Sequence, residues 1–301
     1  MGGASFALAV GIALLAISTA APVAAKNYSP WTEAASVESL PGSSSSLNTG
    51  ALEGCPMQSP DGVSLYFASN RPGGLGGLDI WVAHRPNTAV GFGDPMNLGE
   101  PINSPANDLC PTPVPGGGLF FVSARGGGCG DADIYFARDN PTHGWTSPVN
   151  LGCTVNSPRA EASPSFFEAS GRTFLYFSSG PDIYSAERQP DGSWGAVAPV
   201  AELNSPGNDL RPNVRKDGLE IVLDSDRTGT LGGQDLYFAT RSSVDAPWST
   251  PVNAGTNINT AASELRGSFS RDAETLYFGR TPAPEGSMDL YFTTRDRVSG
   301  G

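Results

Sequence analysis

The chain has 301 residues and a formal net charge of −12, from 18 Lys and Arg residues against 30 Asp and Glu residues. Nucleic acids and anionic membrane surfaces attract basic patches, so this balance argues against both as partners. The 38 Gly and 26 Pro residues are typical of a turn-rich chain, and 9% aromatic residues suffice for the core of one large all-β domain.

Residues 1–25 differ from the rest of the chain. An apolar run from Phe6 to Ala20 is followed by small residues that end at Ala25. This pattern predicts a secretory signal peptide cleaved before Lys26, with an uncleaved anchor as the alternative because the segment before the apolar run has no Lys or Arg. We therefore expect a secreted or periplasmic protein that does not associate with membrane after cleavage, in a compartment that favours disulfides.

A motif recurs five times in the remaining chain. Its first copy reads Leu65 to Ser69, then Arg71, a Gly-rich stretch and Asp79-Ile80-Trp81. The Asp that opens the last element recurs at intervals of 54, 49, 53 and 54 residues, at Asp79, Asp133, Asp182, Asp235 and Asp289. A repeat of roughly fifty residues built from short apolar runs indicates a propeller or a solenoid.

The fourth copy predicts four short strands, over 210–214, 219–224, 235–240 and 248–253, which together make one propeller blade. The fifth copy has only three such strands before the chain ends. The segment from Trp31 to Ala51 resembles the fourth-strand segments of the other copies, as Trp145 and Asn259 mark them. We therefore predict an all-β, five-bladed β-propeller over residues 26–301, with four-stranded blades and a ring closed by the N-terminal strand.

The repeats resemble a known family. The matching residues are Ser59-Pro60-Asp61-Gly62, Leu65-Tyr66-Phe67, Ser69 to Gly74 and Asp79-Ile80-Trp81. They are similar to the WD40-like PD40 repeat of the periplasmic TolB protein and its relatives, across essentially the whole mature chain. The resemblance implies the propeller fold, but not one activity, because the family includes binding modules, peptidase accessory domains and unassigned secreted proteins.

One acidic position recurs just before each innermost strand, which places five carboxylates around one mouth of the channel. These residues are Glu53, Asp108, Glu161, Asp209 and Glu264. The first interpretation is structural: each acid pairs with a repeated arginine, with Arg159 as the substitute in the third blade. The repeated arginines are Arg71, Arg125, Arg227 and Arg280. The second interpretation is a glycosidase that uses two of the acids, and the third is a bound calcium ion.

Two residues after each acid, the copies diverge into Cys55, Cys110, Ser163, Arg211 and Arg266. This asymmetry favours specific binding, so Arg211, Arg266, Arg159 and Ser163 are the candidate ligand-binding residues, for an anionic or polyhydroxylated ligand. The alternative is that the arginines neutralise the neighbouring acids. The repeated Asp at the start of each third strand, from Asp79 to Asp289, is expected to cap a turn or to hold the blade's arginine.

The four cysteines are expected to form disulfides. Cys129 and Cys153 lie in loops that the antiparallel order places on one side of blade two, and Cys55 and Cys110 occupy equivalent positions on adjacent inner strands. No His-Glu-x-x-His, Cys-x-x-Cys or Gly-x-Ser-x-Gly sequence occurs, which argues against a zinc site and a hydrolase nucleophile elbow.

Together these patterns predict a monomeric, non-catalytic binding or scaffold module that recognises a protein, peptide or glycan at the mouth carrying the five acids, without a cofactor. The alternative is a carbohydrate-active hydrolase or lyase that uses two of the same carboxylates.

Overall fold

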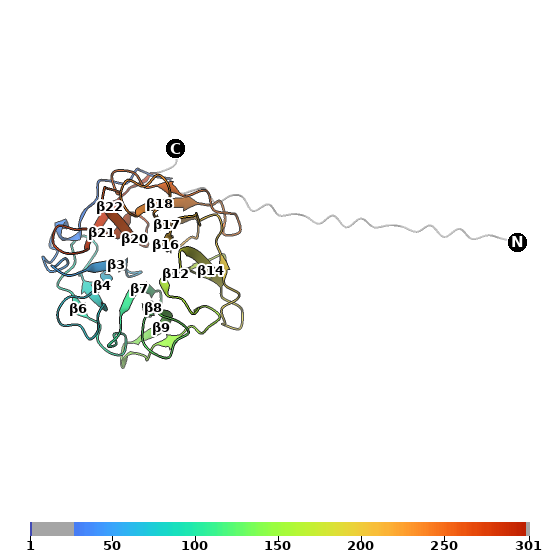
Figure 1. Cartoon of the computed structure of the whole chain (residues 1–301), viewed down its shortest axis with the longest axis horizontal. Coiled ribbons are helices and arrows are strands. Elements are labelled where there is room, and N and C mark those ends of the chain that lie inside the picture. Colours follow the sequence, from blue (N-terminus) through green and yellow to red (C-terminus); the bar gives the residue numbers. More distant parts are fainter. Residues whose placement is uncertain (2–26, 299–301) are drawn as a thin grey trace.

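The computed structural model describes Met1 and residues 27–298, so the predicted signal peptide lies outside the described residues. Figure 1 looks down a ring of five blades, with β3, β7, β12, β16 and β20 nearest the centre and the later strands of each blade farther out. The predicted five-bladed β-propeller is confirmed.

Each blade is an antiparallel sheet whose strands follow the chain from the channel outward. Blade one holds β3 (Glu53–Gln58), β4 (Ser64–Ser69), β5 (Asp79–His84) and β6 (Met96–Asn97). Blade two holds β7 (Asp108–Val114), β8 (Gly118–Ser123), β9 (Asp133–Asn140) and β11 (Val149–Asn150), with β10 (Gly144–Trp145) extending β9 as a hairpin. Blade three holds β12 (Glu161–Ala169), β13 (Arg172–Ser179), β14 (Asp182–Glu187) and β15 (Ala198–Pro199).

Blade four holds β16 (Asp209–Val214), β17 (Glu220–Ser225), β18 (Asp235–Thr240) and β19 (Val252–Asn253). Blade five holds β20 (Ser263–Phe269), β21 (Thr275–Thr281) and β22 (Asp289–Thr294), and its outer strand comes from the other end of the chain. The outer strand of blade four is only two residues long, whereas the sequence predicted six over 248–253.

The N-terminal segment closes the ring as predicted. β2 (Ala35–Ser36) pairs with β22, and the short helix η1 (Val37–Ser39) follows it directly. Val37 and Leu47 are fully buried in a core cluster with residues of blades one and five. A further short pair, β1 (Asn27–Tyr28) with β23 (Arg297–Val298), joins the two ends of the chain. β2 covers the outer edge of β22, which would otherwise be free to pair with another strand.

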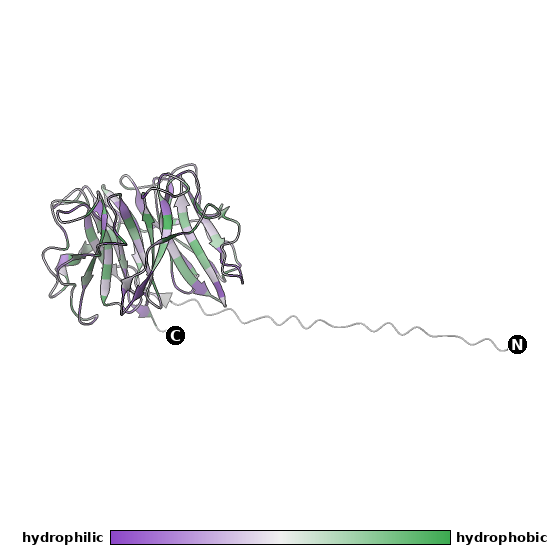
Figure 2. Cartoon of the chain, turned by 90° about the horizontal axis from the view of Figure 1, so that it is seen from below, coloured by the Kyte–Doolittle hydropathy of each residue, from purple (hydrophilic) through white to green (hydrophobic). Residues whose placement is uncertain are grey.

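Blades pack face to face around the ring, so the middle strands are buried on both sides. Leu65 and Phe67 of β4 contact Tyr277 and Leu290 of blade five, whereas Ala68 of the same strand packs toward blade two. Figure 2 shows the result, with hydrophobic residues along the middle of the strands and hydrophilic residues in the loops at both ends.

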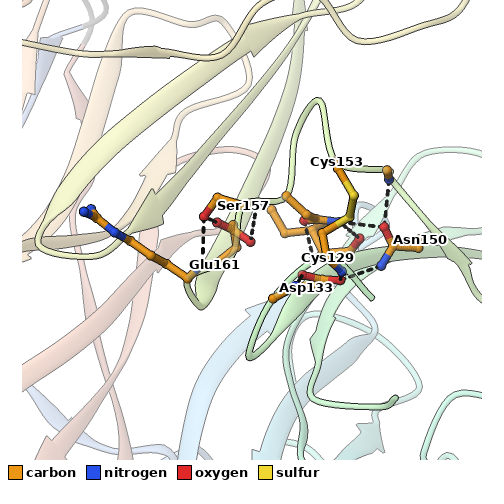
Figure 3. The surroundings of a disulfide bond; sticks show 11 residues. Cys129, Asp133, Asn150, Cys153, Ser157 and Glu161 are labelled. Atoms are coloured by element: carbon orange, nitrogen blue, oxygen red, sulfur yellow. Dashed lines mark hydrogen bonds between the residues drawn. A yellow bond between two sulfur atoms is a disulfide. The ribbon is translucent and has the colours of Figure 1, made fainter. Parts of the chain in front are cut away.

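Both predicted disulfides are confirmed. Cys129 and Cys153 have Cα atoms 5.6 Å apart and join two loops of blade two (Figure 3), and Cys55 and Cys110 have Cα atoms 4.8 Å apart and join the inner strands of blades one and two. Two disulfides indicate an oxidising extracellular or periplasmic environment. Within residues 27–298, no helix is both long enough and apolar enough to span a membrane.

Candidate functional site

The propeller has two faces that differ in the residues they expose. We call the end where the inner strands begin the acid face, because the five recurring acids lie there, and the end where they finish the turn face. The turn face carries the tight turns that lead into each second strand, such as Ser59 to Gly62, and it also carries the β1–β23 pair.

The five acids of the acid face are buried, with at most 1% of any of them exposed. Four of them form ion pairs within their own blade: Glu53 with Arg71 at 3.0 Å, Asp108 with Arg125 at 2.8 Å, Glu264 with Arg280 at 2.8 Å, and Asp209 with Arg227. The same arginines also donate hydrogen bonds to backbone carbonyls in the outer segment of the preceding blade. Arg71, for example, donates to Leu47 O at 2.8 Å. The carboxylates therefore fasten neighbouring blades together and do not line an open mouth.

Glu161 is the exception among the five acids. It accepts hydrogen bonds from Ser157 N at 3.1 Å, Ser157 Oγ at 2.6 Å and Ser179 Oγ at 2.9 Å, as Figure 3 shows for Ser157. Burial raises the pKa of the Glu161 carboxyl above its ordinary value, against the lowering effect of these hydrogen bonds. The expectation that Arg159 replaces the missing arginine is wrong: Arg159 is exposed, and its guanidinium forms no ion pair with Glu161 in the described structure.

The repeated Asp at the start of the third strand caps the preceding loop. Asp79 accepts from Gly76 N at 3.1 Å and from the side chain of Asn97 at 2.9 Å, and Asp133 and Asp235 make the same contacts. Asp289 lacks the Asn contact, because Ser36 stands at the equivalent position of the closing strand, and its Oδ1 is buried without a hydrogen-bond partner among the described residues. Asp182, in the blade with the shortest loop, is half-buried.

Each inner strand contains a bulge at the position where the repeats diverge. The register of every inner pair shifts there, and the residue has a left-handed φ: 52° for Cys55, 50° for Cys110, 48° for Ser163, 51° for Arg211 and 61° for Arg266. A bulge re-aims a side chain, and all five line one cavity of about 30 Å³ within the channel. We call this narrow section the channel waist; no Asp or Glu lines it.

Two arginines of the waist have different partners. Arg211 forms an ion pair with the buried Asp224 through Nε at 2.8 Å and Nη2 at 2.5 Å, and it donates to Gln234 Oε1 at 2.6 Å. Arg266 donates from Nη1 to the sulfur of Cys55 at 2.6 Å. The structure thus brings Arg211, Arg266 and Ser163 together, and it leaves Arg159 outside the waist.

Sequence reasoning missed Asp224. Four other blades have Ala68, Val122, Ser178 and Gly279 at the equivalent position of the second strand. A charged residue that breaks the repeat at a buried position was the available signal, because buried carboxylates need a partner.

Two cavities large enough for a ligand lie on the turn face. The larger of the two has a volume of about 700 Å³, within the range of small-molecule sites, and we call it the groove. It crosses the seam between blades five and one, and it is lined by Gln58, Pro60, Asp61, Arg85, Lys216, Arg271, Asp272, Glu274, Tyr277 and Arg297, among others. A second cavity of about 260 Å³ adjoins it at Pro60 and Asp61 and contains Tyr66, Asp139 and Trp145.

Three carboxylates in the groove, those of Asp61, Asp272 and Asp296, form no ion pair with any described residue, and two of them lie in tight turns. Asp61 and Asp272 are both exposed, and each accepts a hydrogen bond of 2.5 Å from a serine two residues earlier, Ser59 and Ser270. The Ser59 hydroxyl lowers the pKa of Asp61, which keeps this carboxyl ionised. The groove therefore combines a ligand-sized volume with carboxylates that are not committed to arginine.

Polar aromatic groups complete the groove. Tyr277 receives a hydrogen bond from Gln58 at 3.1 Å, and burial raises the pKa of its hydroxyl to about 12. The pKa of Tyr66 in the adjoining cavity also rises to about 12, through burial first and then through the charges of Asp139 and Asp61. Both hydroxyls stay protonated and can donate hydrogen bonds.

The third interpretation of the five acids, a bound calcium ion, has no supporting geometry among the described residues. Over residues 27–298, no group of three or more His, Cys, Asp or Glu side chains is arranged to hold a metal ion. The five acids satisfy their hydrogen bonds separately, each within or beside its own blade.

No protein-family model and no curated protein matches the chain. Many solved structures share its fold. The α-L-arabinofuranosidase PaAbf62A from Podospora anserina matches with a TM-score of 0.57 and 13% identity, over 89% of this chain and 96% of that one. An α-L-arabinofuranosidase from Lactobacillus brevis matches with a TM-score of 0.56 and 15% identity, over 81% and 90%. TolB from Acinetobacter baumannii reaches a TM-score of 0.45 at 13% identity, over 81% and 54%, so the resemblance to PD40 repeats stays a prediction.

These comparisons correct one sequence-based interpretation. The prediction of a non-catalytic binding or scaffold module is contradicted, because the structural neighbours are mostly glycoside hydrolases, among them a xylosidase and an endo-arabinase. The alternative that the sequence left open is a carbohydrate-active hydrolase or lyase. The structure in turn moves the candidate carboxylates of that alternative, because the five acids of the acid face are buried.

Proposed function

We propose that the chain is a glycoside hydrolase that binds its glycan in the groove of the turn face. The observation that carries the proposal is the groove itself: about 700 Å³ lined by Asp61 and Asp272, two carboxylates without an ion-pair partner in the described structure. Glycoside hydrolysis needs two carboxyl groups, one to protonate the leaving oxygen and one ionised to act as base or nucleophile. The fold shared with glycosidases supports the same reaction class.

Both carboxylates accept a hydrogen bond from a serine of their own turn, and we assign one of the two roles to each. Asp61 has a lowered pKa because of Ser59, which suits the ionised base or nucleophile. The role of general acid then falls to Asp272 on the adjacent blade. Gln58 and Tyr277, which line the same groove and bond to each other, offer hydrogen bonds to sugar hydroxyls.

Export belongs to the same proposal. The disulfides require an oxidising environment, and the apolar segment 6–20 has the pattern of a secretion signal. A secreted or periplasmic hydrolase meets polysaccharide or its fragments there, so a glycan is the proposed partner.

The test is a panel of polysaccharides and aryl glycosides that includes arabinan, arabinoxylan and xylan, incubated with the mature protein. Asp61→Asn and Asp272→Asn should each lower turnover at least about 100-fold with unchanged melting temperature. Asp191→Asn is the matched control, because Asp191 accepts the same type of turn hydrogen bonds from Ser193 but lies outside the groove. Absence of hydrolysis across the panel, or full activity in both groove variants, would overturn the proposal.

A further inference from the structure

The channel waist carries one more positive charge than it can neutralise. Arg211 and Arg266 lie on adjacent inner strands, and Asp224 is the carboxylate beside them. Asp224 is fully buried and binds Arg211 with both oxygens, while the backbone N–H of Arg266 donates to its Oδ1 at 2.9 Å. The guanidinium of Arg211 is thus paired with Asp224, whereas the guanidinium of Arg266 has no carboxylate partner among the described residues.

The guanidinium of Arg266 is also short of hydrogen-bond acceptors. It has five N–H donors, and the one acceptor that the described residues supply is the Cys55 sulfur, which is a weak one. Nε of Arg266 is buried and has no partner there. Burial, helped by the charge of Arg211 and opposed by Asp224, lowers the pKa of Arg266 to about 9. The group therefore lacks an adequate counter-charge.

The cavity that Arg266 lines is small, and apart from Arg211 and Arg266 its lining is neutral. Its polar lining includes Ser163, Asn213 and Ser268, and its volume is about 30 Å³. A water molecule needs a cavity of roughly 10–15 Å³ on the same kind of measure, so there is room for one or two atoms of that size, and a sugar ring is excluded.

We propose that the channel waist binds a small monatomic anion, chloride under ordinary conditions, against the guanidinium of Arg266. The anion supplies the missing negative charge and an acceptor for the free N–H groups. It also ties blade five to blade one, because Arg266 already contacts the disulfide-bonded Cys55. The site lies in the channel and does not rest on the hydrolase function of the groove.

The first measurement is thermal unfolding of the wild-type protein in sodium chloride, sodium bromide or sodium isethionate at equal ionic strength, isethionate being too large for the waist. Chloride and bromide should raise the melting temperature by roughly 2–4 °C in a saturable way. Arg266→Gln should abolish this response, and Arg159→Gln, which changes an exposed arginine outside the waist, should retain it. Equal melting temperatures in the three salts would overturn the proposal.

The second measurement keeps the test decisive if Arg266→Gln does not fold. Crystals of the wild-type protein grown in sodium bromide should show an anomalous scattering peak within hydrogen-bond distance of the Arg266 guanidinium. A waist without a bromide peak would contradict the site.

Discussion

Glu161 differs from the other four acids of the acid face in having hydroxyl and amide donors but no guanidinium. The repeat predicted which residues share this position, and the missing arginine of blade three was visible as Ser179-Gly180-Pro181. Burial was not visible, because the pattern of one strand does not show how deeply its first residue lies under the neighbouring blade. For the same reason the sequence placed these carboxylates at an open mouth.

This difference predicts opposite responses to the same substitution. In Glu53→Gln, the new amide group must face either Arg71 or the backbone N–H of Thr49, which are both donors, so the free energy of unfolding should fall by roughly 3–5 kcal/mol. In Glu161→Gln, the amide can donate to Ser157 Oγ and Ser179 Oγ while its oxygen accepts from Ser157 N. This variant should change stability by under about 1 kcal/mol. Urea unfolding at pH 7 measures both, and equal losses would refute the distinction.

The raised pKa of Glu161 also predicts a pH dependence. A carboxyl whose pKa is higher in the folded protein stabilises it fully below the unfolded pKa, about 4.3, and this contribution is lost as pH rises through the folded value. The stability of the wild-type protein relative to Glu161→Gln should therefore decrease from about pH 4 upward. Urea unfolding of the two proteins over this range measures the difference, and a difference that grows with pH would contradict the assigned shift.

At the scale of elements, the blades could be predicted because each repeats the same short apolar runs and turn residues. The closing strand could be predicted because the fifth copy lacks its outer strand and residues 31–51 resemble the missing segment. The bulges in the inner strands could not be predicted from the sequence. A left-handed φ at Cys55 or Arg266 has no sequence signal other than the Pro56 or Gly267 that follows.

The closing segment should contribute strongly to stability. Leu47 is fully buried between blades five and one, so Leu47→Ala should lower the free energy of unfolding by about 2–5 kcal/mol. Val252→Ala is the control, because Val252 lies on an outer strand and 67% of it is exposed; its effect should stay within about 0.5 kcal/mol. Chemical denaturation of both variants checks the prediction, and a mild effect of Leu47→Ala would mean that closure contributes little.

At the scale of the whole molecule, the residues that connect the blades and the residues that line the groove lie in different parts of the propeller. The acid face and the waist hold the blades together through ion pairs, a disulfide and the proposed anion, whereas the turn face offers the ligand-sized groove. Sequence reasoning placed the ligand at the acid face, whereas the proposed function places it at the turn face. The groove forms from turns of different blades and from the chain ends, and their juxtaposition depends on ring closure.

The location of the glycan is the central claim of this account. A crystal structure of Asp61→Asn with an oligosaccharide chosen from the hydrolysis panel measures it directly. We predict a sugar chain in the groove, with one glycosidic oxygen beside Asp272 and hydroxyls within reach of Gln58 and Tyr277. A sugar bound instead at the acid-face mouth above Arg211 and Arg266, with the groove empty, would contradict the account.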